Sequence, residues 1–165
     1  MILKIRRRES GATFIHPMFP TPRTVILAPG FQQTKLVRVF PGGWTQAAAR
    51  FNPSCIAGPT EQLRRLTGLG LQLRHSLIAF TYDGQAGLSD DDRDLFWDSF
   101  GVPAFEQHLG PGNELLAMEC EAHAGLHVLG GFEDVHLDRN SCGCGNPAPR
   151  FSKRSRIHEL VEMLA

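Results

Sequence analysis

Three cysteines and one histidine in the C-terminal half of the chain have the residue types of a metal site. Six residues separate Cys120 from His127, fourteen separate His127 from Cys142, and a single glycine, Gly143, separates Cys142 from Cys144. Three thiolates and one imidazole complete the four-coordinate, tetrahedral shell of structural zinc sites. The glycine lets the backbone turn so that its amides can face the sulfurs. We therefore predict a structural zinc ion held by these four side chains, with no open position for catalysis.

Other interpretations of this pattern stay open. His123 also lies between the first cysteine and the later pair, so it competes with His127 as the nitrogen ligand. Without a metal, Cys120 would be a small buried residue, and Cys142 and Cys144 would be a reducible pair. The fourth cysteine, Cys55, follows an apolar pattern and is predicted to belong to the core, since no histidine or acid stands beside it in the sequence.

The composition excludes several classes of protein. The chain has 165 residues, of which 42% are hydrophobic and 21% charged, as expected for a globular domain. Its 17 basic residues balance 17 acidic ones, so the charge excess of a nucleic-acid-binding protein is missing and we predict no nucleic-acid partner. No apolar run reaches the length of a membrane span or of a signal peptide, which predicts a soluble, cytoplasmic protein without a membrane partner.

Strand and helix patterns alternate along the chain. Apolar and β-branched runs bounded by proline and glycine predict strands, and an Ala-rich run and capped amphipathic runs predict helices. The expected strands cover residues 24–28, 35–40, 54–57, 76–81, 102–105, 115–120, 126–129 and 134–137. The expected helices cover residues 44–51, a segment starting at Pro59, and a segment starting at Asp90. This order predicts an α/β layered domain with a mostly parallel sheet, followed by a small zinc-braced strand region.

Three acidic residues, Asp90, Asp91 and Asp92, follow Ser89 and could be taken for a cation site. Successive helical residues point in different directions, so they cannot easily converge on one ion. Ser89 is a favourable N-cap, and carboxylates stabilise the first turn of a helix. We interpret the run as a helix start.

Three segments are expected. Residues 1–23 form an extended N-terminal arm, because its prolines forbid regular helix, and residues 24–150 form the α/β domain with the zinc knuckle. Residues 151–165 form a C-terminal amphipathic helix, whose apolar positions repeat with helical spacing at Ile157, Leu160, Val161 and Leu164.

One stretch, from about Phe51 to Arg150, resembles the phenylacetate–CoA ligase-like branch of the adenylate-forming (AMP-binding) superfamily. The resemblance is carried by residues 52–59, by Tyr82-Asp83-Gly84-Gln85, and by residues 100–105 before the position of a Tyr-Gly-x-Thr-Glu motif. The closest match is residues 119–128 with Cys142-Gly143-Cys144-Gly145 downstream. The resemblance implies the distal half of that family's large α/β domain.

The sequence departs from that family at the positions that handle ATP. The nearest segment to its phosphate-binding loop, residues 29–35, lacks the repeated small residues that wrap phosphate. Residues 106–110 stand where the Tyr-Gly-x-Thr-Glu motif is expected, and no C-terminal domain with a catalytic lysine follows. Without these groups the charge of a leaving pyrophosphate is not neutralised, so the chain alone is not expected to activate carboxylates.

These observations predict a non-catalytic, zinc-stabilised binding or assembly module derived from a phenylacetate–CoA ligase-like protein. The alternative is the substrate or adenine-pocket subunit of a split ligase that would use ATP and CoA, completed by another chain. The residues lining its pocket would then be Asp83, Gln85, Phe105, Glu106 and His108.

A third interpretation is a small metalloenzyme. Its zinc ion would have an open position, and Glu119 or Glu121 would serve as the general base. Because the fold is shorter than the family's, we also expect exposed apolar surface and therefore a homo-oligomer or a partner protein.

Overall fold

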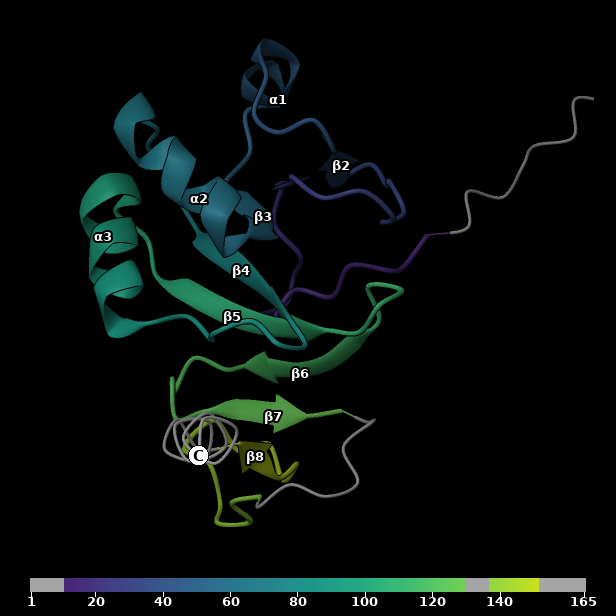
Figure 1. Ribbon diagram of the computed structural model, residues 1–165, viewed down its shortest axis with the longest axis vertical. Helices are drawn as coiled ribbons and strands as arrows, with labels where there is room; N and C mark the ends of the chain where they lie inside the picture. The colour runs from purple at the N-terminus through teal and green to yellow at the C-terminus, as the bar shows by residue number, and fades with distance from the viewer. Residues whose placement is uncertain (1–10, 130–136, 152–165) are drawn as a thin grey trace, which may run out of the picture.

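The computed structural model describes residues 11–129 and 137–151, and they build one eight-stranded sheet with helices packed on it (Figure 1). The strand order is β2-β1-β3-β4-β5-β6-β7-β8. The strands are β1 (Thr24–Ile26), β2 (Val37–Val39), β3 (Cys55–Pro59), β4 (Ser76–Tyr82), β5 (Ala104–Leu109), β6 (Leu115–Glu119), β7 (Leu126–Val128) and β8 (Arg150–Phe151). The helices are α1 (Gln46–Phe51), α2 (Thr60–Leu66) and α3 (Asp90–Phe100), with a 3-10 turn, η1 (Thr67–Leu69), after α2.

The sheet has a parallel part and an antiparallel part. Strands β2, β1, β3, β4 and β5 run parallel to one another, whereas β6, β7 and β8 are added antiparallel. The predicted α/β domain with a mostly parallel sheet is confirmed at this level. Central strands of parallel sheets are covered on both faces, which explains why every residue of β5 is buried and why β4 is an almost unbroken apolar run.

The chain reverses its direction of travel across the sheet near its start. From β1 it moves outward to β2, then returns past β1 to place β3 on the opposite side, and continues outward through β4 and β5. This order creates a topological switch point between β1 and β3, at the carboxyl ends of those strands.

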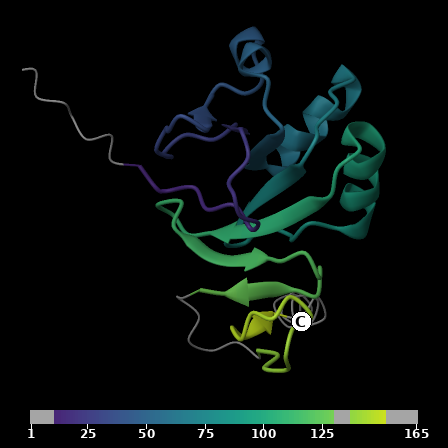
Figure 2. The same cartoon turned by 180° about the vertical axis from the view of Figure 1, so that it is seen from behind.

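Two hydrophobic cores flank the parallel strands. On one face, α1, α2 and α3 cover the sheet through side chains that include Ala48, Leu63 and Phe96. On the other face, Phe14 and Phe31 pack on the sheet from the segments that precede β1 and β2. Figure 2 shows the N-terminal segment, in purple, on the side of the sheet away from α3.

Local sequence signals explain the helix ends. Ser89 caps α3, and its side chain and that of Asp92 form a reciprocal capping box with the backbone. Gly101, with a φ of 68°, ends the helix in the left-handed region that glycine occupies without strain. The prediction of a helix start at the acidic run is confirmed. The helix expected to start at Pro59 begins one residue later, at Thr60, and Pro59 occupies the position before it without a side-chain capping hydrogen bond.

The largest difference from the expected elements is at β5. A strand was expected over 102–105, but β5 covers Ala104–Leu109. The second half of β5 contains three polar residues, Glu106, Gln107 and His108, and polar residues do not predict a buried strand. Their side chains can be buried because they form hydrogen bonds with neighbouring elements. The expected strand over 134–137 lies mainly outside the described residues, as do residues 1–10 of the arm. The predicted C-terminal helix over 151–165 also lies outside them except for Phe151, which belongs to β8 and not to a helix.

Candidate metal centre

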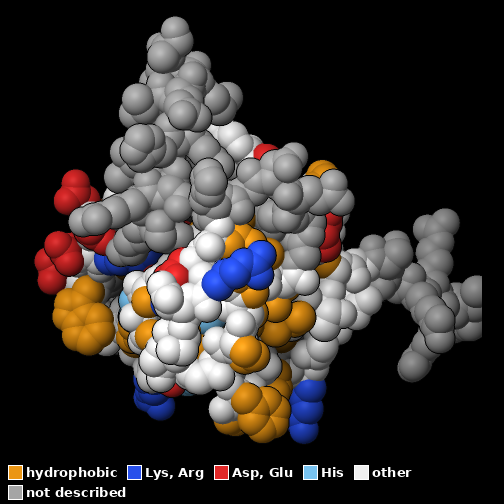
Figure 3. Space-filling view, turned by 90° about the horizontal axis from the view of Figure 1, so that it is seen from below, with side chains coloured by type: hydrophobic (Ala, Val, Ile, Leu, Met, Phe, Trp, Pro, Cys, Tyr) orange, Lys and Arg blue, Asp and Glu red, His pale blue; other side chains and the backbone are white. Residues whose placement is uncertain are grey.

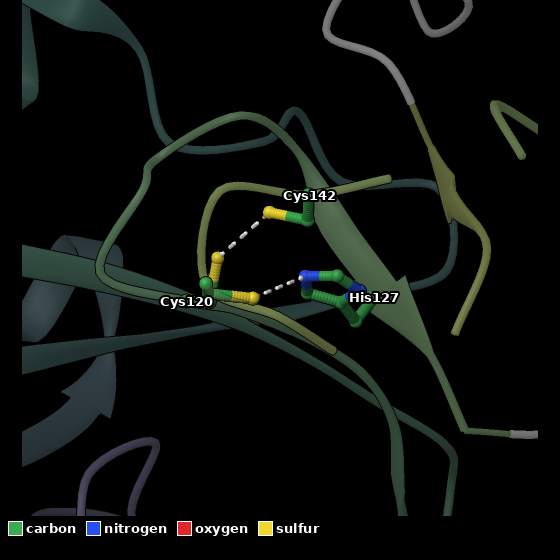
Figure 4. Close-up of side chains that lie close together, drawn as sticks. Cys120, His127 and Cys142 are labelled. Carbon is green, nitrogen blue, oxygen red and sulfur yellow. Dashed lines mark hydrogen bonds between the residues drawn. The ribbon is translucent and has the colours of Figure 1, made fainter. Parts of the chain in front are cut away.

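The four predicted metal ligands come from three separate segments that meet beside the antiparallel part of the sheet. Cys120 follows β6 directly, and His127 is the middle residue of β7. Cys142 and Cys144 lie in a turn ahead of β8. The labelled side chains of Cys120, Cys142 and His127 point toward one another in Figure 4.

The distances between the ligand atoms fit a tetrahedral ion. Cys120 Sγ lies 3.6 Å from Cys142 Sγ, and Cys144 Sγ lies 3.4 Å from His127 Nε2. All four ligand atoms lie within 4.8 Å of one another. Zinc–sulfur bonds of about 2.3 Å and zinc–nitrogen bonds of about 2.0 Å, at tetrahedral angles, would separate two sulfurs by about 3.8 Å and a sulfur from a nitrogen by about 3.5 Å. These two contacts match the expected separations, and the four side chains together could hold a metal ion.

Backbone amides surround the sulfurs. The Ala122 amide donates to Cys120 Sγ, the Cys144 amide to Cys142 Sγ, and the Asn146 amide to Cys144 Sγ at 3.4 Å. The turn that presents the last two sulfurs is closed by the Gly145 amide, which donates to the Cys142 carbonyl at 3.0 Å, and Gly145 has a φ of 79°. These amide donors stabilise negatively charged sulfur, which is the form that binds metal.

The orientation of the His127 ring is also fixed. Its Nδ1 lies 2.9 Å from the Ala148 carbonyl, so Nδ1 carries the hydrogen and donates it, and Nε2 keeps a free electron pair toward the sulfurs. The sequence analysis did not predict the hydrogen bond to Ala148, because any residue type can supply a backbone carbonyl. The flanking prolines, Pro147 and Pro149, were the available signal, since prolines favour an extended backbone in this segment.

The thiols differ in acidity. The Cys144 amide lowers the pKa of Cys142 to about 6, which outweighs the opposing effect of burial. Burial raises the pKa of Cys120 to about 11, and the two neighbouring cysteines add to that shift. Cys120 would therefore keep its proton at neutral pH, and a metal ion that binds its sulfur would have to displace that proton.

His123, the competing ligand, is placed differently. Its Nδ1 lies 3.1 Å from Glu119 Oε1, and its ring stacks on Phe105 with the ring centroids 4.8 Å apart. His127, and not His123, belongs to the set of converging ligand atoms.

Glu119 was proposed as a general base in the metalloenzyme interpretation, but its carboxylate is buried and engaged by other groups of the fold. It is 2% exposed, and its Oε2 accepts from the Glu106 amide at 2.9 Å and lies 3.0 Å from Arg93 Nη2. Sequence reasoning did not find this buried ion pair, because Arg93 and Glu119 are far apart in the chain and meet only through the packing of α3 on the sheet.

The residues predicted to line a substrate pocket fall into two groups. Asp83, Glu106 and His108 are linked through Thr81, which donates to Glu106 Oε1 at 2.9 Å and lies 3.3 Å from His108 Nδ1. The other nitrogen of His108 lies 3.0 Å from Asp83 Oδ1, and Asp83 is largely exposed. The Leu88 amide donates to Glu106 Oε2 at 3.0 Å, so the loop after β4 is tied to β5.

Phe105 and Gln85 do not join that group. Phe105 belongs to the core on the face of the sheet opposite the helices, whereas its strand neighbour Glu106 turns toward the α3 face. Gln85 is exposed, and its Oε1 accepts from the Tyr82 amide in the turn after β4. Asp83, Glu106 and His108 therefore form one network, to which Phe105 and Gln85 do not contribute.

No protein-family model matches the chain, and no curated protein is significantly similar to it. Within residues 11–129 and 137–151, none of the helices has the length and apolarity needed to cross a bilayer.

Proposed function

We propose that this chain is a non-catalytic binding or assembly module in which a structural zinc ion holds β6, β7 and the segment before β8 together. The observation that carries the proposal is the convergence of Cys120, His127, Cys142 and Cys144, from three segments, to within 4.8 Å. Sulfur-rich tetrahedral sets favour zinc over magnesium or calcium, which prefer oxygen ligands. The residue set and the fixed His127 tautomer fit this ion.

A structural role follows from the number of ligands. Four protein donors fill a tetrahedral shell and leave no position for water or substrate, whereas catalytic zinc sites have three protein ligands. Glu119 is engaged by Arg93 and by a backbone amide. Both observations favour a structural ion over the metalloenzyme interpretation.

The exposed apolar residues support the assembly part of the proposal. Large hydrophobic side chains at the surface include Phe19, which is 97% exposed, and Trp97 on α3, which is 57% exposed. Figure 3 shows hydrophobic groups among charged ones on the visible part of one face.

A derivation from an adenylate-forming ligase belongs to the proposal as well, and rests on the sequence resemblance over residues 51–150.

Metal analysis of the purified protein tests the proposal. The wild-type chain should contain about one zinc per molecule, and Cys144→Ser should lose most of it. Cys55→Ser is the matched control, because Cys55 is buried in β3 outside the cluster and its variant should keep the metal. A wild-type protein without metal after purification in zinc-containing buffer would refute the zinc site. Light scattering that finds only monomers at all concentrations would count against self-association.

A further inference from the structure

The three sulfurs of the metal centre are not equivalent. Cys120 Sγ and Cys142 Sγ lie 3.6 Å apart, in direct contact. Cys144 Sγ instead lies 3.4 Å from His127 Nε2 and accepts from the Asn146 amide at 3.4 Å. The four ligand atoms therefore divide into a sulfur–sulfur pair and a sulfur–nitrogen pair, and the two dashed contacts of Figure 4 mark this division.

Both sulfurs of the sulfur–sulfur pair belong to residues outside the strands. Cys120 follows the last residue of β6, and Cys142 lies in the turn ahead of β8. An S–S bond is about 2.05 Å long, so the two atoms must approach by about 1.5 Å to form one. Because neither residue belongs to a strand, this approach needs no change in the pairing of the sheet.

A small oxidant can reach this pair. Cys120 is half-buried, and the two residues that follow it are exposed. Cys142 is buried, but its neighbour Gly143 is exposed, and a Cβ placed on that glycine would meet nothing within 4 Å. Thiol oxidation follows thiolate character and exposure, and a backbone amide donates to each of the two sulfurs. Cys55 is fully buried in β3 and so provides an unreactive reference.

From these observations we infer that Cys120 and Cys142 are a peroxide-reactive pair that closes to a disulfide and thereby expels the metal ion. The partner of Cys142 is Cys120 and not Cys144, the partner expected from the sequence for a protein without metal, because Cys144 Sγ is directed to His127. The release of the ion rests on the proposed function, whereas the pairing of the two sulfurs does not.

The reaction balances with hydrogen peroxide as the oxidant. One thiolate of the pair attacks a peroxide oxygen, the O–O bond breaks, and hydroxide leaves as a sulfenic acid forms. The second sulfur, 3.6 Å away, attacks the sulfenic sulfur, the S–S bond forms, the S–O bond breaks, and a second hydroxide leaves. Two electrons pass from the two thiolates to peroxide, whichever sulfur reacts first. A dithiol reverses the step by thiol–disulfide exchange and is itself oxidised.

Disulfide formation changes what the centre joins. Of the four donors only Cys144 and His127 remain, and structural zinc sites have four. The covalent bond still joins the end of β6 to the segment before β8, where Cys120 and Cys142 lie, but β7 loses its link through His127. Peroxide thus exchanges a metal link between three segments for a covalent link between two, which makes the module redox-sensitive.

Peptide mapping of the full wild-type chain tests the pairing. Trypsin cleaves after Arg93, Arg139 and Arg150, which places Cys120 in residues 94–139 and the other two cysteines of the cluster in residues 140–150. Peroxide should join these two peptides through one disulfide while Cys55 stays reduced. A disulfide within 140–150 as the main product, or sulfinic acid without any disulfide, would overturn the inference.

Two variants identify the sulfur of the turn that reacts. Cys144→Ser and Cys142→Ser are a matched pair, because each keeps Cys120 and one cysteine of the turn. After removal of metal with a chelator, the same peroxide treatment should link the two peptides several-fold more in Cys144→Ser than in Cys142→Ser. Equal linking in the two variants would contradict the pairing, and the wild-type map decides the question if either variant does not fold.

Zinc release is measured on the same wild-type samples with a chromophoric chelator. Peroxide should release nearly all of the bound zinc, and dithiothreitol followed by zinc should restore it. Zinc that stays bound while no disulfide forms would overturn the inference and leave the proposed function intact. A chain that binds no zinc before oxidation would instead refute the proposed function, and the link between the two peptides would still decide the pairing.

Discussion

His123 and His127 lie four residues apart, yet the structure gives them different chemistry. His127 turns Nε2 toward three sulfurs while its Nδ1 donates to the Ala148 carbonyl. His123 sits against Glu119 and stacks on Phe105. Sequence spacing could not separate the two, because both fall between Cys120 and Cys142, and only the direction of the β7 strand selects one of them.

Substitution of each histidine tests this assignment. His127→Ala should weaken zinc binding by well over 10-fold, the minimum expected even for loss of an outer-shell partner, because it removes a direct ligand. His123→Ala should bind zinc within a few-fold of wild type. Competition titration with a chromophoric chelator measures both affinities, and a greater loss in His123→Ala than in His127→Ala would reverse the assignment.

Cys55 makes a separate prediction about alkaline pH. Burial raises the pKa of this thiol to about 12, against an ordinary value of 9.0, and hydrogen bonds from Ser76 and Thr24 oppose the shift only in part. The unfolded chain therefore loses this proton at a lower pH than the folded chain, so the contribution to stability is complete below about pH 9 and is lost as the pH rises toward about 12.

The measurement is urea unfolding of wild type and Cys55→Ala at about pH 8 and about pH 10. The free energy of unfolding of wild type should fall by about 1.4 kcal/mol more than that of the variant over this interval. The cavity left by the alanine lowers the stability of the variant at both pH values and cancels in the comparison. Identical pH dependence in the two proteins would show that the thiol ionises normally in the fold.

Among the secondary-structure elements, α3 was predictable and β5 was not. The start of α3 is encoded locally by Ser89 and Asp92, and its end by Gly101, so the sequence carries both boundaries. The second half of β5 is stabilised by contacts from elsewhere: Glu106 from Thr81 and Leu88, and Gln107 from the Ile15 carbonyl. Hydrogen-bond partners this far apart in the chain leave no local sequence pattern, so the polar residues of β5 predict a loop when only the sequence is considered.

Asp92 joins two helices as well as capping one. Its carboxylate accepts from Arg64 Nε at 2.7 Å and from Arg64 Nη2 at 3.0 Å, which ties α3 to α2. Burial alone would raise the pKa of Asp92, but Arg64 and Ser89 outweigh it and hold the pKa below its ordinary value of 3.8. The stabilisation is thus complete above about pH 4 and is lost as the pH falls through the lowered folded pKa.

Asp92→Ala should lower the free energy of unfolding by about 1–2 kcal/mol at neutral pH, because it removes half of the capping box and the contact to Arg64. Arg64 is half-exposed, so the ion pair supplies the smaller part. Asp91→Ala, in the same helical turn but exposed, is the matched control and should cost less than about 0.5 kcal/mol. Chemical denaturation at neutral pH measures both, and equal effects would contradict the role given to Asp92.

In the whole molecule, the hydrophobic cores are unevenly distributed. The parallel strands lie between two extensive apolar clusters, whereas the described part of β6–β8 has a buried cluster of only Ala117, Leu126 and Phe151. A metal ion that joins three segments would compensate for so small a core, as it does in small domains.

Metal removal should therefore act locally. Chelation should increase hydrogen exchange of amides in β7 and in residues 138–151, while amides of β3 and β4, which lie between the two larger cores, stay protected. Hydrogen-exchange mass spectrometry with and without chelator checks this. A loss of protection that is uniform over the sheet would mean that the ion stabilises the whole fold and not one end of it.

The sequence predicted the architecture better than the sites. Alternating strand and helix patterns were sufficient for the α/β sheet, because burial on both faces leaves long apolar runs such as β4. The convergence of Cys120, His127, Cys142 and Cys144 was predictable from residue type, because three cysteines and one histidine are a donor set of tetrahedral metal sites. The buried ion pair of Arg93 and Glu119 was not, because the two residues meet only through the packing of α3 on the sheet.

The most direct test of the account is X-ray absorption spectroscopy at the zinc edge of the purified, metal-loaded protein. We predict three sulfur ligands at about 2.3 Å and one nitrogen ligand at about 2.0 Å from the metal. A first shell of oxygen and nitrogen only, or a protein that takes up no zinc, would contradict the metal centre formed by Cys120, His127, Cys142 and Cys144.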